Sequence, residues 1–580
     1  MYPKLKVLPT SRQMVDVFRG YNHNLRISTG EFYDMRNLTS DLYPVLSPRK
    51  PRGIYAKPAS PQALIAKEQL CYVDGADFVI GEERIAMGLS TAHGDNPKRL
   101  VSMGAYVIIL PDKMYCNTID PEDHGAIEAT VTTSGEVTMT LCAGSGENYP
   151  DAVVSPTAPE NPENLDLWID SSSEPHSLKQ YSKATGQWVG IVSTYVKISA
   201  TGIGKGLNQY DGVTISGLTG DAEGLNGSAV LWHVEEDAIV VVGLLDKAVT
   251  QTEAVTVTRA MPNMDFVIES ENRLWGCRYG TAANGEFVNE IYACKLGDFR
   301  NWSCYMNLST DSYAASCGTD GPFTGAITHL GYPLFFKENC VHKIFGSYPA
   351  NFQIQTISCR GVQKGCQDSL AIVNETLYYK SRSGICAFDG SLPSEASYAL
   401  GAVEYGNAVG GAHGNKYYVS MMDDQGQWNL FVYDTAKGLW HREDNLHALA
   451  FCSHGSEMYC INADTMNIIT MLGSGEALEE KVRWMAETGE LGISSPDMKY
   501  ISRITLRMAA DVDTVIRVYA QYDMSEEWIL LCDIRATSLR SFSVPIRARR
   551  CDFMRLRIVG EGHAGIYSYT KTIEQGSERS

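Results

Sequence analysis

The chain repeats one short phrase, a polar turn containing glycine that leads into a strand beginning with an aromatic residue. Three copies place Gly two residues before Trp, at Thr185–Trp188, Gln425–Trp428 and Lys437–Trp440, and looser versions occur at Asp298–Trp302 and Ser525–Trp528. Glycine supplies the dihedral angles that tight turns between antiparallel strands need, and a large aromatic just past the turn packs across the hairpin. The sequence therefore predicts a long series of β-hairpins.

The hairpins occur in two series, one beginning near residue 62 and one after about residue 262. Successive hairpins start roughly 40 to 60 residues apart, which is the spacing of four-stranded propeller blades. No helical segment interrupts these units, and closing them radially would hide the strand edges that an open sheet leaves exposed. We therefore expect an all-β chain with a β-propeller formed by residues 61–117 and 263–473. Open sandwiches are the alternative.

Three further segments flank or interrupt the predicted propeller. Residues 1–60 contain Pro44, Pro48 and Pro51, which exclude a helix and disfavour a central strand, so this segment is predicted to be an extended N-terminal arm. Such an arm packs either on its own chain or on a neighbouring subunit. Residues 118–262 are rich in Ser, Thr, Gly, Asn and Pro and are predicted to be an inserted β-rich domain. Strand-like runs within residues 481–570 predict a C-terminal β-sandwich.

Charge and hydropathy restrict the classes of ligand. The 580 residues include 49 Lys and Arg against 68 Asp and Glu, a formal net charge of -19. This balance argues against a general phosphate-binding surface, and hence against nucleic acid as a bound ligand, although nucleic acid could pass along a repelling channel. No run approaches the ~18 apolar residues of a membrane helix, so no membrane anchor is expected. The first twenty residues lack the apolar core of a secretory signal, which predicts synthesis and folding in a cytosol.

The 15 cysteines are odd in number and scattered along the chain. No C-x-x-C motif occurs, and the closest pair, Cys359 and Cys366, is seven residues apart. Many cysteines lie within strand-like apolar runs. Free thiols packed as small hydrophobic side chains are therefore predicted, in preference to disulfides or metal ligands.

Several motifs resemble catalytic or binding sites without completing one. The loop Gly202–Gly206 lacks the spacing of a P-loop, and His233–Glu235 lacks the P-C-x-x-C partner of the zinc deaminases. Cys452, His454 and Cys460 could meet on one hairpin, but a fourth metal ligand is missing. We therefore predict no catalytic residue, no cofactor and no metal site.

Carboxylates and tryptophans remain as candidates for carbohydrate chemistry. Two Asp or Glu residues at a suitable separation suffice for glycoside hydrolysis. Asp at the start of a turn is, however, an ordinary structural feature, and the S-x-D-x-G-x-T-W box of sialidases is absent, so we expect no enzyme. Trp168 and Trp188 are candidate glycan contacts of the inserted domain, with packing in its core as the alternative. The carboxylates near predicted strand ends are Asp166, Asp170, Asp298, Asp389 and Asp434.

Several phrases of the chain resemble a known group of viral proteins. Gly30–Leu38, running into Tyr43–Arg49, is similar to the opening of bacteriophage tail propeller proteins, such as the nozzle, hub or stabilisation proteins of short-tailed phages. A second likeness is the strand and Gly-Asp-x-x-Asn-Trp turn of Asn289–Trp302. Shorter matching phrases occur at Leu334–Asn339, Arg360–Gln363 and Arg549–Asp552. The likeness covers most of the chain outside the inserted domain, which departs from the compact nozzle pattern.

The resemblance implies a structural virion protein, a propeller platform or nozzle subunit around the tail axis. It implies copies of the chain in a ring, contacts with adaptor, portal or fibre proteins, and assembly in the host cytoplasm, with the genome passing nearby without specific binding. The inserted domain would then be a decoration that contacts a host surface glycan or a fibre. The alternative function is a receptor-binding or glycan-binding and glycan-processing propeller on the same tail.

Overall fold

The computed structural model describes residues 10–90, 97–282, 284–493, 498–523, 525–535, 537–547 and 549–575. Within these ranges the chain is built of β-strands, and helical structure is limited to four 3-10 turns (η1 Gly220–Leu225, η2 Pro349–Asn351, η3 Gln367–Ser369 and η4 Tyr398–Leu400). No helix among the described residues has the length and hydropathy needed to cross a membrane. The chain forms two compact units, Met1–Lys98 with Phe335–Val341 and Ile357–Ser580, and Arg99–Leu334 with His342–Thr356.

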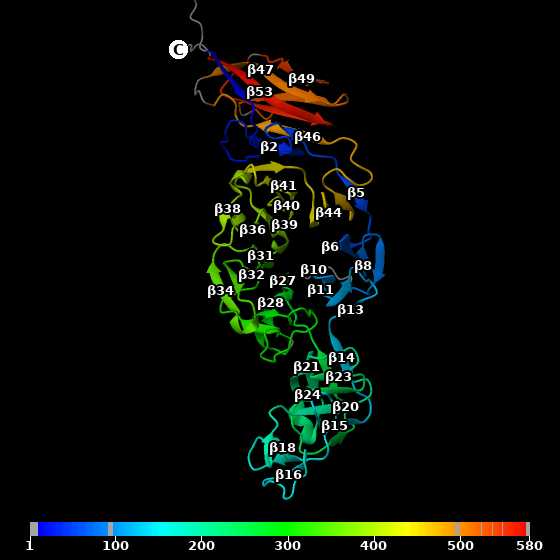
Figure 1. Cartoon of the computed structure of the whole chain (residues 1–580). Helices are drawn as coiled ribbons and strands as arrows, with labels where there is room; N and C mark the ends of the chain where they lie inside the picture. The colour runs from blue at the N-terminus through cyan, green and yellow to red at the C-terminus, as the bar shows by residue number, and fades with distance from the viewer. Residues whose placement is uncertain are drawn as a thin grey trace, which may run out of the picture. The chain divides into compact units, whose positions relative to one another are not determined.

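The fold is all-β, with a β-propeller, an inserted β-rich domain, an extended N-terminal arm and a C-terminal β-sandwich (Figure 1). Seven four-stranded sheets form the blades within the described residues. Six consist of consecutive strands, and the seventh takes its fourth strand from the N-terminal arm. Glycines at positive φ form the predicted turns. Gly426, with a φ of 77°, joins β40 (Lys416–Asp423) to β41 (Trp428–Asp434), and Gly438, with a φ of 66°, joins β41 to β42 (Leu439–Arg442). The prediction of hairpins with aromatic residues past the turn is thus confirmed at both sites.

Four blades belong to the first unit. Their strands are β6 (Pro61–Ala66), β7 (Leu70–Asp74), β8 (Asp77–Ile80) and β9 (Glu83–Ala86); β35 (Ala371–Val373), β36 (Thr376–Ser381), β37 (Gly384–Phe388) and β38 (Ser394–Glu395); β39 (Tyr405–His413), β40 (Lys416–Asp423), β41 (Trp428–Asp434) and β42 (Leu439–Arg442); and β43 (Ala448–His454), β44 (Glu457–Asn462), β45 (Ile468–Thr470) and β5 (Gly53–Ala56). The first strands of neighbouring blades contact one another, β35 with β39, β39 with β43 and β43 with β6.

The second unit contains two complete blades. Their strands are β10 (Arg99–Met103), β11 (Tyr106–Leu110), β12 (Met114–Asn117) and β13 (His124–Ala126); and β27 (Phe266–Ser270), β28 (Arg273–Thr281), β29 (Phe287–Ala293) and β30 (Tyr313–Ser316). The remaining blade, whose residues are shared between the two units, is β31 (Gly325–His329), β32 (Tyr332–Lys337), β33 (Cys340–Phe345) and β34 (Gln353–Ser358). Strand β13 carries the second blade beyond residue 117, the limit expected from the sequence.

The inserted domain lies in the connection between two blades and has three sheets. Two of them enclose a shared hydrophobic core: β14 (Ala129–Thr132), β26 (Thr256–Arg259), β21 (Gly212–Ser216) and β22 (Gly227–Val230); and β23 (His233–Glu235), β24 (Ala238–Val242), β20 (Tyr195–Ser199), β15 (Val137–Cys142) and β25 (Val249–Gln251). The third and smaller sheet is β16 (Val153–Ser155), β17 (Leu167–Asp170), β18 (Ser177–Ser182) and β19 (Gln187–Gly190).

A buried polar joint attaches the inserted domain to the strands on either side of it. Arg259 and Asp211 are both buried and form an ion pair of 2.6 Å, and Arg259 also donates to the backbone carbonyl of Ile127. Asn301, which has no exposed surface, accepts a hydrogen bond of 3.1 Å from the Gly212 amide. A buried charge is stable only when it is paired and hydrogen-bonded, and these contacts meet that condition.

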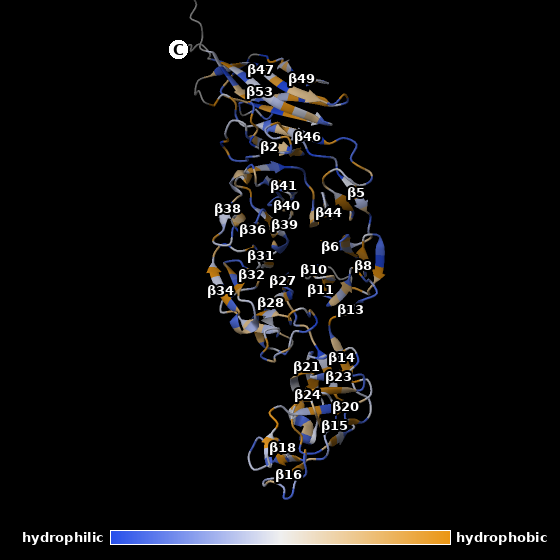
Figure 2. Ribbon diagram, viewed as in Figure 1, coloured by the Kyte–Doolittle hydropathy of each residue, from blue (hydrophilic) through white to orange (hydrophobic). Residues whose placement is uncertain are grey.

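The C-terminal sandwich uses strands from both ends of the chain. One sheet is β2 (Phe32–Arg36), β46 (Arg483–Thr488), β52 (Met554–Glu561), β48 (Val515–Tyr522) and β49 (Ile529–Ile534). The other is β1 (Thr10–Val15), β53 (Ala564–Gln575), β47 (Lys499–Ala510) and β50 (Arg540–Val544), with β51 (Arg550–Cys551) also paired to β47. Buried residues alternate with exposed ones along β47, as expected for a strand with one face in a core, and orange hydrophobic segments run along the sandwich strands in Figure 2.

The N-terminal arm packs on its own chain. Strand β1 pairs with β53, β2 pairs with β46, and β5 pairs with β45 as the outermost strand of the last blade; the blue N-terminal strands accordingly lie beside orange and red C-terminal strands in Figure 1. Between β2 and β5 the arm forms a small ribbon of β3 (Leu38–Thr39) and β4 (Ser47–Pro48). The sequence left open whether the arm docks on a neighbour; in the described residues it is part of both the sandwich and the propeller.

A network of ion pairs around two buried arginines fixes the arm in this position, and we call it the arginine clasp. Arg52 forms ion pairs of 2.8 Å with Glu443 and 2.7 Å with Asp444, and Arg49 pairs with Glu479 at 2.6 Å. Burial alone would raise the pKa of Asp444, but the guanidinium groups of Arg52 and Arg49 outweigh it and hold the pKa below its usual value. The clasp thus joins the arm to the turn after β42 and to the segment that leads into the sandwich.

Candidate functional site

The small sheet of the inserted domain carries a cluster of aromatic residues, which we call the tryptophan cluster: Trp168, Tyr181 and Trp188. The turn at Gly186, with a φ of 65°, brings β19 back along β18 so that Trp188 lies opposite Tyr181. The ring centroid of Trp188 is 5.4 Å from that of Tyr181 and 5.4 Å from that of Trp168. These separations are typical of tilted and edge-to-face aromatic pairs.

Alternation along the strands places this cluster on the face opposite to the local core. Leu167, Ile169 and Leu178 pack together in a buried core, so Trp168 and its cross-strand partner Lys179 lie on the other face. Successive residues of a strand point to opposite faces, so the aromatic side chains gather on one face of the small sheet. The sequence pattern alone does not show whether that face is buried or exposed.

A charged pair borders the tryptophan cluster. The Lys179 ammonium lies 4.6 Å from the Trp168 ring centroid and forms an ion pair of 2.7 Å with Asp170. Hydrogen bonds from Lys179 and from Ser172 lower the pKa of Asp170 to about 2, so this carboxylate is ionised at neutral pH. Asp170 is one of the candidate carboxylates of the sequence, and its ion-pair partner Lys179 lies over the ring of the candidate Trp168.

The two tryptophans differ in accessibility. Trp168 is only 6% exposed, and its indole nitrogen donates a hydrogen bond of 2.9 Å to the Ser155 carbonyl. Trp188 is partly exposed and is flanked on the same strand by Val189, which is 51% exposed. A partly exposed indole can stack on the apolar face of a sugar. Glycan contact stays a prediction, and it now rests on Trp188, because Trp168 is packed within the sheet.

The other candidate motifs have ordinary structural roles. Gly202 and Gly206 adopt positive φ in a loop after β20, and Cys460 is buried within a hydrophobic cluster of the last blade. No group of three or more His, Cys, Asp or Glu residues suited to a metal occurs in the described part of the chain. The five candidate carboxylates accept turn hydrogen bonds or form ion pairs: Asp166 with Glu163, Asp170 with Lys179, Asp298 with Arg300, Asp389 with Ser391, and Asp434 with Lys437.

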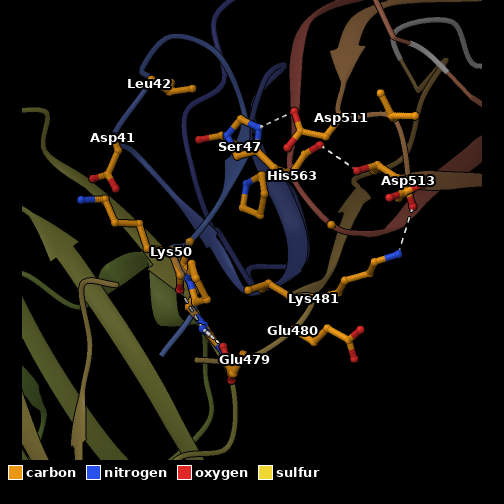
Figure 3. A pocket seen from close by; sticks show the side chains of 17 residues that line it. Asp41, Leu42, Ser47, Lys50, Glu479, Glu480, Lys481, Asp511, Asp513 and His563 are labelled. Atoms are coloured by element: carbon orange, nitrogen blue, oxygen red, sulfur yellow. Dashed lines mark hydrogen bonds and ion pairs between the residues drawn. The ribbon is translucent and has the colours of Figure 1, made fainter. Parts of the chain in front are cut away.

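A pocket of about 620 Å³ lies where the N-terminal arm meets the sandwich (Figure 3). Asp511 and Asp513 stand on one side of it and Asp41 on the other. Lys481 donates to the backbone carbonyl of Asp513 at 3.4 Å. The Lys416 ammonium outweighs the effect of burial and keeps the pKa of Asp41 below its usual value. The pocket has an acidic rim, and the sequence does not indicate it because its residues come from four separate segments of the chain.

A second pocket, of about 520 Å³, contains a buried lysine. Lys380 is 3% exposed and donates hydrogen bonds of 2.7 Å to the Gln363 side chain and 2.6 Å to the Ser381 carbonyl. Burial lowers the pKa of Lys380. Both partners are neutral oxygens, and Glu404 also lines the pocket. A lysine within an alternating strand gives no indication that it will be buried, so the role of Lys380 is not visible in the sequence.

Comparisons with known proteins find similarity only among solved structures. No protein-family model matches the chain, and a search of curated proteins finds no match. An exo-β-1,3-galactanase from Phanerochaete chrysosporium with galactose is 10% identical, covering 53% of this chain and 94% of that one, with a TM-score of 0.20. PorZ, a bacterial surface component of the type-IX secretion system of Porphyromonas gingivalis, is 12% identical, covering 88% and 77%, with a TM-score of 0.26.

A third structure is a family 43 glycoside hydrolase, an arabinoxylan arabinofuranohydrolase from Bacillus subtilis in complex with cellotetraose. It is 9% identical, covers 72% of this chain and 96% of that one, and has a TM-score of 0.13. Superpositions with TM-scores this low carry no argument about what the present chain binds or does.

Proposed function

We propose that this chain is a structural subunit of a bacteriophage tail, forming a propeller platform or nozzle around the tail axis. The observation that carries the proposal is the position of the arm. The phrases Gly30–Leu38 and Tyr43–Arg49, which resemble the opening of phage tail propellers, form β2, β3 and β4, and the arm then adds β5 to the last blade. One continuous segment therefore ties the propeller to the sandwich.

Such a subunit would act through the stiffness of its fold. A strand that enters a sheet from the far end of the chain closes a loop of several hundred residues, and the closed arrangement persists only if specific contacts offset the loss of conformational freedom. The arginine clasp supplies buried, charge-assisted contacts at this point. A platform built in this way transmits force without its blades separating.

The proposed partners are copies of the same chain in a ring, together with adaptor, portal or fibre proteins of the tail. The subunit would assemble in the host cytoplasm and reside in the virion. A formal net charge of -19 suits a wall past which the genome moves without specific binding, because like charges repel.

Electron microscopy and mass spectrometry test this proposal. We expect the purified chain to form rings in negative stain, and we expect its peptides in phage particles purified from the producing host. Particles that lack the chain, together with a purified chain that stays monomeric, would contradict the structural role.

A second function is favoured by the tryptophan cluster: binding of a host surface glycan by the inserted domain. Trp188 is partly exposed and its ring packs against Tyr181 and Trp168, and the Lys179 ammonium lies over the Trp168 ring. Stacking of one sugar ring on an indole contributes about 1 kcal/mol, so Trp188→Ala should weaken glycan binding by about fivefold to tenfold.

The matched control is Trp528→Ala, which removes a partly exposed tryptophan from the sandwich and should leave glycan binding unchanged. Binding to an array of bacterial surface oligosaccharides, followed by titration calorimetry on the hits, measures the effect. We expect binding without cleavage; release of new reducing ends would contradict the expectation that the chain is not an enzyme. No binding by the wild-type chain would refute this second function and leave the structural one intact.

A further inference from the structure

The outer face of the sheet β1–β53–β47–β50 carries four exposed arginines, and we call it the arginine face. Register places Arg12 on β1 opposite Thr572 on β53, and Thr572 opposite Arg503 on β47. Arg507 lies four residues beyond Arg503 on the same strand, and Arg550 on β51 pairs with Tyr500 of β47. Two strand spacings separate Arg12 from Arg503 by about 10 Å, and Arg507 lies about 13 Å along the strand.

Within the described part of the chain these arginines have no counter-ions of their own. Among the residues that the structure describes, Arg12, Arg503, Arg507 and Arg550 form no ion pair or hydrogen bond, and all four are exposed. Most of their neighbours on the face are hydroxyl side chains. Two acids lie close by: Asp16 follows the end of β1, and Glu574 lies on β53 between Thr10 and Tyr500, where it accepts a hydrogen bond of 2.7 Å from Ser502. The hydroxyl side chains are Thr505, Ser541, Ser543, Thr570 and Thr572.

The charge of this region differs from that of the rest of the chain. Residues 481–580 hold 15 of the 49 Lys and Arg and 13 of the 68 Asp and Glu, a net charge of +2, so the first 480 residues carry -21. Unpaired like charges on one face repel one another and disfavour the folded chain in isolation. An acidic partner removes that repulsion, and the chain itself presents an excess of acidic groups.

The composition of the arginine face favours a protein partner over nucleic acid. Met14 lies two residues from Arg12 on the same strand and is 63% exposed. Arg and Met are enriched at protein–protein interfaces, where an apolar anchor is surrounded by charged groups. Nucleic acid would also have to approach a chain whose net charge is strongly negative.

The same sandwich offers an acidic counterpart with a similar apolar centre. Asp511 and Asp513 are exposed on the loop after β47, and Val512 between them is 76% exposed. This loop forms one rim of the pocket in Figure 3, where Glu480 adds a further exposed carboxylate. Two different patches on one chain, of opposite charge and each with an exposed apolar residue, can join successive copies.

We propose that the arginine face is an assembly surface that docks on the acidic loop Asp511–Asp513 of a second copy of this chain. The proposal rests on the proposed structural role, because it names the contact through which copies associate. Opposite charges that meet across an interface steer association and weaken as salt rises.

Charge reversal and charge exchange test this contact. We expect the full-length chain to self-associate in sedimentation velocity at 50 mM NaCl, and the variant R12E/R503E/R507E to raise the dissociation constant at least tenfold. Combining it with D511K/D513K should restore association to within about threefold of the wild-type chain. The matched control Arg517→Glu, an exposed arginine on the other sheet, should change it less than twofold. Circular dichroism verifies that each variant is folded.

Several results would overturn the proposal. A wild-type chain that stays monomeric, or a triple variant that associates normally, refutes it, as does a charge exchange that fails to rescue. Loss of binding to a 20-base-pair DNA duplex in the triple variant, with association unchanged, would assign the face to nucleic acid instead. If the chain is found in phage particles while the triple variant assembles normally, this contact fails and the proposed structural role stands.

Discussion

Removal of one guanidinium from the arginine clasp should release the last blade of the propeller. The variant Arg52→Met keeps a side chain of similar length and removes the charge. In the wild-type chain the Arg52 guanidinium is 2.7 Å and 3.2 Å from the two Asp444 oxygens and 2.8 Å from Glu443. The substitution leaves both carboxylates in a largely buried site without their principal partner.

The expected cost follows from these contacts. Removing one member of a buried ion pair costs about 3–5 kcal/mol, because the remaining charge stays desolvated. Arg49 lies 3.8 Å from Glu443 and 3.6 Å from Asp444 and compensates in part. We therefore expect the lower end of the range, about 3 kcal/mol.

Hydrogen–deuterium exchange of the β5 amides, residues Gly53–Ala56, measures this loss locally. Local exchange is preferable to global unfolding, because a chain with several domains does not unfold in two states. A loss of about 3 kcal/mol accelerates exchange through local opening by roughly 150-fold. The amides of the first blade, in β7, should change much less.

The control is Arg517→Met, which removes an ion pair at the surface of the sandwich. The side chains of Arg517 and Asp533 are 55% and 56% exposed, and exposed pairs contribute less than about 1 kcal/mol. Asp444→Asn combined with Arg52→Met should cost less than the sum of the two single changes, because both remove the same interaction. Exchange at β5 that accelerates less than threefold in Arg52→Met, or equally in the control, would refute the clasp.

Three further predictions concern other parts of the chain. An added methyl group at Gly212 would lie 2.2 Å from the Ser303 backbone, so Gly212→Ala should destabilise the attachment of the inserted domain by about 1–3 kcal/mol. The control Gly224→Ala adds a methyl group that meets no atom within 4 Å, and it should leave thermal unfolding unchanged. Burial lowers the pKa of His441 to about 3. Because the pKa of an unfolded histidine is about 6.5, the folded chain should lose stability as the pH falls below 6.5. His441→Phe should remove this pH dependence of stability between pH 7 and 5, and a variant with the wild-type pH profile would contradict the prediction. The 15 free cysteines, 11 of them buried, should make the unfolding midpoint insensitive to reductant and leave most thiols unreactive toward a thiol reagent until the chain unfolds.

The local features of the fold could be predicted from the sequence. Turn glycines and alternating apolar residues are properties of a few neighbouring residues, so the hairpins at Gly426 and Gly438 were identified without any knowledge of their neighbours. The free cysteines were predicted in the same way, from the apolar strands that contain them.

Strand partnership over long distances could not be predicted from these patterns. Strand β5 has only four residues and follows a proline-rich stretch, and it pairs with β45 more than 400 residues away. Nothing in its own sequence specifies that partner. The choice depends on the clasp around Arg52 and on the shape of a blade that lacks its fourth strand.

The solvent exposure of the candidate site residues could not be predicted from the sequence either. The sequence indicated Trp168 and Trp188 equally, because each is an aromatic residue in a polar region. The structure buries Trp168 under its neighbours and leaves Trp188 partly exposed, and it adds Tyr181 and Lys179 through cross-strand pairing.

The sequence by itself thus determined an all-β chain of hairpins, because backbone dihedral preferences and the two-residue period of a strand are local. Only the tertiary structure decided how the arm threads the sandwich and the last blade, which indole reaches solvent and which arginines share a face. Those features depend on register between segments hundreds of residues apart, where a shift of one residue exchanges the buried and exposed faces of a strand.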